Sequence, residues 1–268
     1  PPTPSQCPPP SNPTPYNPTP HLPTNPYPER ERGASDRDRF LPKHYPFKSY
    51  GFLGESMGLY MPTCLLCSCV HGSVYCDDLE LDSVPPLPKD TVYLYARFNK
   101  IRTLRKKDLT GYAQLKRVDL SSNGLTSVEA GALAQLPALE EVLLAGNELV
   151  ALPELPPATR RLDARQNHVT SKGVAADMFE KMKQLEYLYL SDNQLDFIPV
   201  PLPDSLRVLH LQNNNIQQIR EDTFCKPKEL SYFRKALEDV RLDGNPINLS
   251  DAPEAYTCLP RIPTGTTF

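Results

Sequence analysis

The chain has 268 residues, and its 31 prolines are unevenly distributed, because 16 of them lie in residues 1–63. Only the rest of the chain can therefore bury a sizeable core. The net charge of −3 comes from 29 basic and 32 acidic residues, so the overall charge predicts binding to neither nucleic acid nor membranes. No apolar run approaches the roughly 18 residues of a membrane span, and nothing at the start resembles a signal peptide. We expect a soluble, processed chain.

The first part of the chain is rich in proline and then in charge. Residues 1–28 contain 13 prolines interleaved with Thr, Ser and Asn, and residues 29–40 alternate opposite charges. Such compositions favour an extended chain without a core, so we expect residues 1–62 to form a disordered Pro/Thr-rich stalk and charged linker. Hydroxyls beside prolines suit O-glycosylation, with a bare spacer as the alternative; the candidates are Thr3, Thr14, Thr19 and Thr24.

Beyond this part the sequence repeats the template L-x-x-L-x-L-x-x-N-x-L. Five copies begin at Leu115, Leu139, Leu185, Leu206 and Leu237, and two weaker copies begin at Thr91 and Thr159. The spacing of the asparagines, 20 to 31 residues, is typical of leucine-rich repeats apart from the long last interval. These asparagines are Asn99, Asn123, Asn147, Asn167, Asn193, Asn214 and Asn245.

The template predicts a leucine-rich-repeat solenoid. Alternating apolar residues form short parallel β-strands on the concave face, and stacking buries a core that no single repeat could form. We expect each asparagine to satisfy backbone groups of the turn after its strand. The convex connections should be mostly irregular or extended, as at residues 152–157 and 198–203, with a short helical turn at 174–185. The repeats occupy 91–224.

The cysteines stand where a solenoid needs caps. Four of them, Cys64, Cys67, Cys69 and Cys76, precede the first repeat, Cys225 and Cys258 bracket the last, and Cys7 is left without a partner. A four-cysteine zinc site is the alternative at the first cluster, but the C-x-C core makes adjacent ligation awkward. Disulfides are favoured, which implies an oxidising compartment and secretion. The caps occupy 63–90 and 225–268.

The cysteine spacing and the segments CDDLELDSVPPLP, YLYARFNKI, YLYLSDNQLD and ALEDVRLDGNPINLS resemble the class III small leucine-rich proteoglycans of extracellular matrix. The resemblance extends from Pro62 to Phe268. It implies the disulfides Cys64–Cys69, Cys67–Cys76 and Cys225–Cys258, the last across an extended "ear" repeat. The chain contains no Ser-Gly dipeptide, the usual attachment site of glycosaminoglycan chains. This absence favours an O-glycosylated glycoprotein.

No feature of the sequence predicts an enzyme, a cofactor or a metal site. It contains no HExxH or P-loop motif, and its five histidines are scattered. We therefore expect a secreted matrix glycoprotein that binds collagen fibrils through its solenoid and so regulates matrix organisation. Glycosaminoglycans are a second expected class of ligand. The alternative is a secreted ligand or receptor-type module that modulates cell adhesion or growth-factor signalling. A receptor would continue into a membrane helix, whereas this sequence ends ten residues after Cys258.

The concave face is the first candidate binding site. Tyr and Arg, which are favoured at interface hot spots, recur at its strand positions, although a solvated strand face is the alternative. The family resemblance implies two competing uses, binding of fibrillar collagen and formation of a homodimer. The candidates are Tyr93, Tyr95, Arg97, Arg117, Arg161, Arg165, Tyr187, Tyr189, His210 and Arg241.

Two further sites concern sulfated sugars and glycosylation. Residues 97–117 carry eight basic residues against the single acid Asp108, which predicts a site for heparan or chondroitin sulfate unless the side chains are simply solvated. The sequon Asn248-Leu249-Ser250 predicts N-glycosylation at Asn248. Besides Arg97 and Arg117, the polyanion-binding candidates are Lys100, Arg102, Arg105, Lys106, Lys107 and Lys116.

Overall fold

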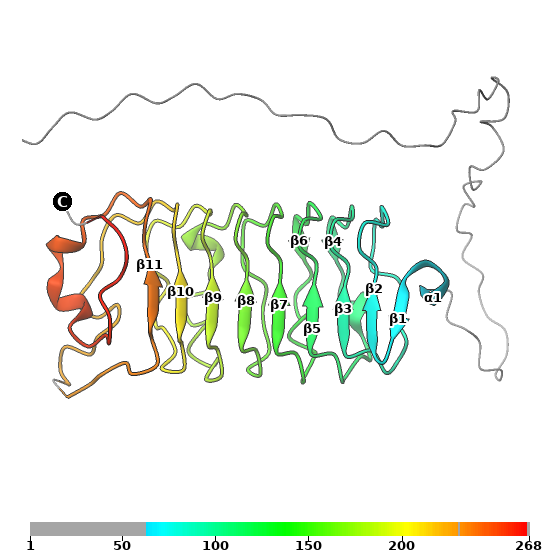
Figure 1. Ribbon diagram of the computed structural model, residues 1–268, viewed down its shortest axis with the longest axis horizontal. Coiled ribbons are helices and arrows are strands. Elements are labelled where there is room, and N and C mark those ends of the chain that lie inside the picture. The colour runs from blue at the N-terminus through cyan, green and yellow to red at the C-terminus, as the bar shows by residue number, and fades with distance from the viewer. Residues whose placement is uncertain (1–62, 230, 267–268) are drawn as a thin grey trace, which may run out of the picture. The chain divides into compact units, whose positions relative to one another are not determined.

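The computed structural model describes residues 63–229 and 231–266. The expected stalk, the candidate O-glycosylation threonines Thr3, Thr14, Thr19 and Thr24, and Cys7 lie outside the described residues. Those residues form a solenoid whose sheet has nine strands in the order β1-β2-β3-β5-β7-β8-β9-β10-β11 (Figure 1). The strands are β1 Ser68–Val70, β2 Ser73–Tyr75, β3 Tyr93–Tyr95, β5 Arg117–Asp119, β7 Glu141–Leu143, β8 Arg161–Asp163, β9 Tyr187–Tyr189, β10 Val208–His210 and β11 Asp239–Arg241.

The sheet forms because every repeat places an apolar residue at the centre of its strand. Leu94, Val118, Val142, Leu162 and Leu188 are all buried in one continuous core. Their neighbours on either side point to the opposite face, since side chains alternate along a strand. From β2 to β11 all pairings are parallel, and only β1 pairs antiparallel, with β2. The predicted leucine-rich-repeat solenoid is confirmed.

The repeat asparagines form a ladder through backbone groups. In Asn123, Nδ2 donates to the carbonyl oxygens of Ala96 and Leu120 at 2.9 and 3.0 Å, and Oδ1 accepts from the amide of Ile101 at 3.2 Å. The other ladder residues make the same kind of contacts, and all seven are at most 9% exposed. Each one therefore satisfies polar groups of two successive turns, the structural role expected from the sequence.

The residue before each ladder asparagine adopts a left-handed backbone conformation. Gly146 and Gly244 have φ of 67° and 70°, and the five other repeats place a non-glycine residue there with φ between 53° and 57°. Those residues are Phe98, Ser122, Gln166, Asp192 and Asn213. This conformation turns the chain sharply out of the strand, at a cost that only glycine avoids.

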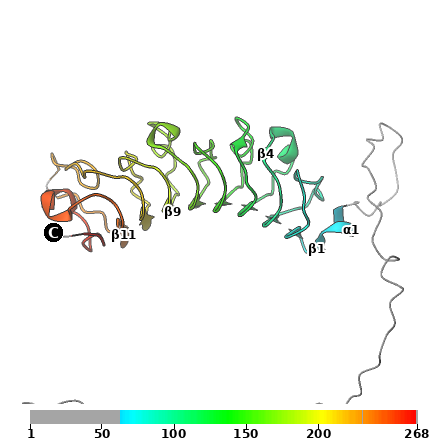
Figure 2. The same cartoon turned by 90° about the horizontal axis from the view of Figure 1, so that it is seen from above.

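The convex connections differ in part from the expected irregular structure. A second, two-stranded parallel sheet pairs β4 Thr103–Leu104 with β6 Ser127–Val128, and 3-10 helices occupy η1 Lys106–Leu109 and η2 Ser171–Gly173. In place of the short helical turn expected at 174–185 the chain forms successive hydrogen-bonded turns, in which an amide bonds the carbonyl three residues before it. Two of its side chains, Phe179 and Met182, fill the core instead. Figure 2 shows the strands along the inner side of the curved solenoid.

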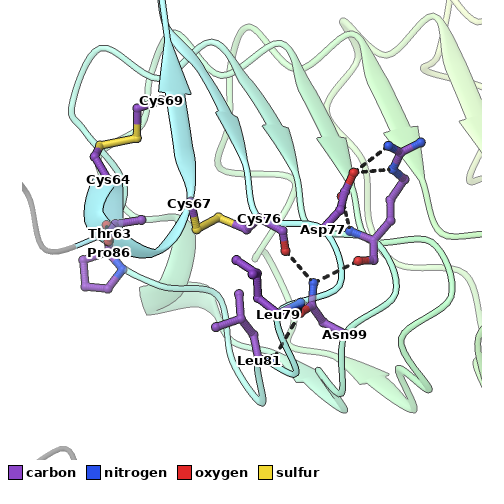
Figure 3. The surroundings of a disulfide bond; sticks show 11 residues. Thr63, Cys64, Cys67, Cys69, Cys76, Asp77, Leu79, Leu81, Pro86 and Asn99 are labelled. Carbon is purple, nitrogen blue, oxygen red and sulfur yellow. Dashed lines mark hydrogen bonds and ion pairs between the residues drawn. A yellow bond between two sulfur atoms is a disulfide. The ribbon is translucent and has the colours of Figure 1, made fainter. Parts of the chain in front are cut away.

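Two disulfides build the N-terminal cap (Figure 3). The pairs are Cys64–Cys69 and Cys67–Cys76, as the family resemblance implies, and they rule out the alternative zinc site. The short helix α1, Thr63–Leu66, contains Cys64 and ends just before Cys67. The ladder reaches into the cap, because Asn99 Nδ2 donates to the carbonyl of Cys76 at 2.8 Å. The cap is therefore continuous with the first repeat.

The third disulfide, Cys225–Cys258, closes the C-terminal cap across 33 residues. The chain then returns beside the last strand, where Thr264 exchanges backbone hydrogen bonds with Val240 and Leu242 at 2.9 and 2.7 Å. The 3-10 helices η3 Leu249–Asp251 and η4 Pro253–Tyr256 lie between β11 and Cys258 in the sequence. This returning segment pairs with β11 and so protects the edge of the sheet.

A buried arginine fixes the long loop of the ear. Arg234 is 8% exposed and donates to the carbonyl oxygens of Phe224, Pro203 and Leu202 at 2.6 to 2.9 Å. Beside it, Tyr232 donates to Asp204, and burial together with this bond raises the pKa of Tyr232 to about 12. The ear is thus tied to the preceding repeat by backbone acceptors as well as by its disulfide.

Candidate functional site

The concave face presents two rows of side chains, one from each end of the three-residue strands. Parallel pairing without offsets aligns the rows across the sheet. The first row is Tyr93, Arg117, Glu141, Arg161, Tyr187, Val208 and Asp239. The second row is Tyr95, Asp119, Leu143, Asp163, Tyr189, His210 and Arg241.

A first cluster of arginines and tyrosines lies near the N-terminal cap. The rings of Tyr75 and Tyr95 are stacked with centroids 4.9 Å apart. The guanidinium carbons of Arg97 and Arg117 lie 6.0 and 5.2 Å from the centroid of Tyr95. The hydrogen bond from Arg97 to Asp77 raises the pKa of the arginine against the opposing effect of burial. The cluster is a rigid aromatic surface edged by positive charge.

A second cluster repeats this arrangement further along the sheet. The guanidinium carbons of Arg161 and Arg165 lie 4.9 and 5.3 Å from the centroid of Tyr189. The His210 ring meets the same tyrosine edge-on, with centroids 5.0 Å apart. Arg165 also donates to Asp163 at 2.9 to 3.0 Å, a bond that raises the pKa of Arg165 against the opposing effect of burial.

Three second-row positions of the concave face are buried. Asp119, Leu143 and Asp163 are only 5%, 7% and 2% exposed. Adjacent strands are about 4.8 Å apart, so longer arginine and tyrosine side chains cover a shorter residue between them. Both carboxylates are satisfied locally, Asp119 by Ser121 and Asp163 by Arg165. These acids therefore hold the face in shape and do not present free charge.

The last two strands carry a small network of charged side chains. His210 Nε2 lies 2.9 Å from Asp239 Oδ2, and Arg241 Nε donates to Asp239 Oδ1 at 3.2 Å. Burial by itself raises the pKa of Asp239, but the hydrogen bonds from His210 and Arg241 outweigh it and leave this pKa below its usual value. Asp239 therefore stays ionised between two donors.

All ten predicted face residues lie on this one surface. Tyr93, Arg165 and Arg241 are exposed, and the other seven are half-buried. Sequence reasoning missed Tyr75 and Asp77, because the cap lacks the repeat template. The alternation in Ser73-Val74-Tyr75 before the first repeat is the signal that could have revealed Tyr75. The binding roles of these residues stay predictions.

A line of ion pairs follows the rim of the sheet, at the residue before each strand. Lys116 pairs with Glu140, Arg160 with Glu186, and Arg207 with Glu238, over 3.1, 2.5 and 3.7 Å. Opposite charges alternate from strand to strand along this rim. Such exposed pairs contribute little stability individually, but together they leave the rim nearly neutral beside the concave face.

The predicted polyanion patch is less basic than its sequence window indicates. Four of its residues pair with acids of neighbouring turns: Arg97 with Asp77, Lys100 with Glu80, Lys116 with Glu140, and Arg117 with Glu141. Counting charges along the window missed these acids, because stacking brings residues some 20 positions apart together. Within the described part of the chain, Arg102, Arg105, Lys106 and Lys107 form no ion pair and lie on the convex side around β4 and η1.

The predicted N-glycosylation residue caps a 3-10 helix. Asn248 Oδ1 accepts from the amide of Ser250 at 3.0 Å, and its Nδ2 donates to Asp251 at 3.1 Å. The side chain is half-buried at the N-cap of η3. Its glycosylation stays a prediction.

The described residues offer no metal site and no membrane span. Within 63–229 and 231–266, no three His, Cys, Asp or Glu residues are placed to hold a metal ion. No helix in the same ranges is long and apolar enough to cross a bilayer.

The fold and this face define a disulfide-capped leucine-rich-repeat protein. Leucine-rich-repeat family models match residues 92–149, 184–204 and 205–227. Solved structures share the fold: a chain of the octameric complex of Latrophilin 3, Unc5D and FLRT2 has a TM-score of 0.56 at 23% identity, covering 73% of this chain and 57% of that one. Human 5T4 (trophoblast glycoprotein) has a TM-score of 0.50 at 22% identity, covering 76% and 90%.

Relatives identify the family. Epiphycan of Homo sapiens is 52% identical over 81% of this chain and 67% of its own length. Opticin of Bos taurus is 52% identical over 80% and 67%, and mimecan of Mus musculus is 48% identical over 78% and 70%. The chain belongs to the class III small leucine-rich proteoglycan family.

Proposed function

We propose that this protein is a secreted glycoprotein of the extracellular matrix that binds fibrillar collagen through its concave face and thereby organises the matrix. The observation that carries the proposal is the pair of arginine–tyrosine clusters around Tyr95 and Tyr189 on one continuous sheet. Membership of a matrix family and three disulfides support secretion. We propose no catalytic activity for this protein.

The face suits a long, repetitive partner. Its strands are fixed by backbone pairing and its tyrosines are held by stacking and cation–π contacts, so little side-chain freedom is lost on binding. Tyrosine and arginine carry a large share of binding energy at protein interfaces. Homodimerisation through the same face is the competing use, and a dimer closed in this way would exclude collagen.

The test is co-sedimentation with collagen fibrils. We expect the double variant Tyr187→Ala, Tyr189→Ala to lose at least about tenfold in affinity, because it removes two of the five tyrosines on the face. The matched control is Phe233→Ala, since Phe233 is an exposed aromatic residue in the ear. Circular dichroism verifies the fold, and sedimentation velocity reports dimerisation. Unchanged fibril binding together with an unchanged sedimentation profile would refute the role of this face.

A second candidate function rests on the convex basic residues. We propose that Arg102, Arg105, Lys106 and Lys107 bind sulfated glycosaminoglycans, because they carry four charges without ion pairs within the described residues. The triple variant Arg105→Ala, Lys106→Ala, Lys107→Ala should elute from heparin at a lower salt concentration. Elution at the parental salt concentration would show that these residues are not the site.

A further inference from the structure

The concave face is symmetric about its central strand in a way that the repeat template does not require. The two strands on one side of β7, β5 and β3, carry the same residue types at matching positions as the two strands on its other side, β8 and β9. The first row reads Tyr93, Arg117, Glu141, Arg161, Tyr187, and the second reads Tyr95, Asp119, Leu143, Asp163, Tyr189. One strand further out, an aromatic ring contacts the second-row tyrosine on each side, Tyr75 and His210.

A single glutamate lies between the two mirrored arginines in the first row. Glu141 lies on the strand between Arg117 and Arg161, and its Oε2 is 3.0 Å from Arg117 Nη1. Arg161 forms no ion pair with any described residue, although it lies over Tyr189 as Arg117 lies over Tyr95. The Nε atoms of both arginines are shielded from solvent and have no hydrogen-bond partner within that part of the chain. Arg117 thus has Glu141 at 3.0 Å and Asp119 at 3.7 Å, whereas Arg161 has no ion-pair partner among the described residues.

The separation of these arginines matches a repeat in the proposed partner. Two steps between strands span about 9.5 Å. A polyproline II chain rises about 3.1 Å per residue, so one Gly-X-Y triplet of a collagen-like triple helix spans about 9.3 Å. A triple helix laid across the strands would therefore bring equivalent residues of successive triplets over Arg117 and Arg161.

We propose that Glu141 is a shared counter-ion, which pairs with one mirrored arginine and leaves the other to bind an acidic side chain of the triple helix. This inference rests on the proposed function and deepens it. Because Arg117 and Arg161 occupy mirrored positions, an acidic residue of the triple helix can pair with either arginine. The two binding positions of the triple helix then differ by one Gly-X-Y triplet. The protein can thus shift along a repetitive partner by exchanging Glu141 between Arg117 and Arg161.

An acidic ligand fits this site for a physical reason. Each arginine lies over one second-row tyrosine and is half-buried, so part of its guanidinium can still be reached by a ligand. A carboxylate supplies acceptors and the opposite charge to the accessible part of the guanidinium, and charge-assisted hydrogen bonds of this kind are stronger than neutral ones. A neutral triple helix can contact the tyrosines but leaves the free arginine unpaired.

The experiment measures binding of the full chain to three triple-helical peptides: one with Glu in two successive triplets, one with Glu in a single triplet, and a neutral Gly-Pro-Pro peptide. Glu141→Gln frees both arginines, so its affinity for the two-Glu peptide should rise at least about tenfold while that for the single-Glu peptide changes less than about threefold. The matched control is Glu186→Gln, which removes a carboxylate from an ion pair on the rim.

A second variant tests the free arginine directly. Arg161→Ala leaves only Arg117, which must release Glu141 before it can bind, so affinity for the single-Glu peptide should fall about tenfold. Equal effects of Glu141→Gln on both acidic peptides, or tight binding of the neutral peptide by the unchanged protein, would overturn the counter-ion role. Loss of the proposed function itself would look different, because the protein would then fail to bind collagen fibrils at all.

Discussion

The asparagine ladder and the two rows of the concave face lie only four to six residues apart in every repeat, yet they are built on opposite principles. The ladder uses the same buried residue seven times, and each copy satisfies backbone groups of two turns. The face uses different residues at each step, most of them partly accessible to solvent. Because neighbouring positions of a short strand point to opposite sides, the repeat can hold its core constant while its outer surface changes. Stability and recognition are thus carried by separate positions.

The largest effect is expected from breaking the ladder at its centre. Asn147→Ala removes the acceptor of the amides of Asn123 and Leu125 and the donor to the carbonyls of Leu120 and Leu144. Leaving buried polar groups unsatisfied should reduce the free energy of unfolding by about 3 to 5 kcal/mol, as measured by urea denaturation. Asn215→Ala is the control, because this exposed asparagine lies outside the ladder. Equal losses in both variants would contradict the ladder's role.

The second prediction compares the two caps. In the chain-entropy model, removal of Cys225–Cys258, which spans 33 residues, costs about 4 kcal/mol, whereas removal of Cys64–Cys69, which spans 5, costs about 2 kcal/mol. The paired alanine variants should therefore differ in thermal stability, with the C-terminal pair less stable. A reversed order would mean that native contacts around the caps outweigh loop entropy, and that Arg234 holds the ear without its disulfide.

The third prediction concerns the left-handed residue before the ladder. Gln166 is exposed with φ of 53°, where Gly146 and Gly244 occur in other repeats. Gln166→Gly relieves the conformation that disfavours any Cβ and should stabilise the protein by about 1 kcal/mol. Gln166→Ala retains the Cβ and serves as the control for loss of the long side chain. If both variants change stability equally, backbone conformation is not the cause.

The ladder, the core and the residues that line the face were predictable from sequence, but the burial and pairing of those face residues were not. Asn99 to Asn245 share one chemical task in each copy, so their period reveals their position and their role. The burial of Asp119 and Asp163, and the pairing of Lys100 with Glu80, depend on neighbours about 20 residues away in the adjacent turn. The small sheet of β4 and β6 arises in the same way, since two-residue strands form only when turns are stacked. Local patterns contain no such information.

The smallest expected effect on stability concerns Asp239 on the concave face, through the pH dependence of its charge. Its pKa is lowered in the folded protein, so it contributes stability above the ordinary carboxyl pKa near 4 and loses that contribution as the pH falls through the folded value. Asp239→Asn removes this charge, so the variant should melt about 1 or 2 °C below the parent at about pH 7, and the gap should close toward about pH 3. Thermal melts of both proteins at matched ionic strength provide the measurement. A gap that stays constant with pH would show that the hydrogen bonds of Asp239, and not its charge, hold His210 and Arg241 at this end of the face.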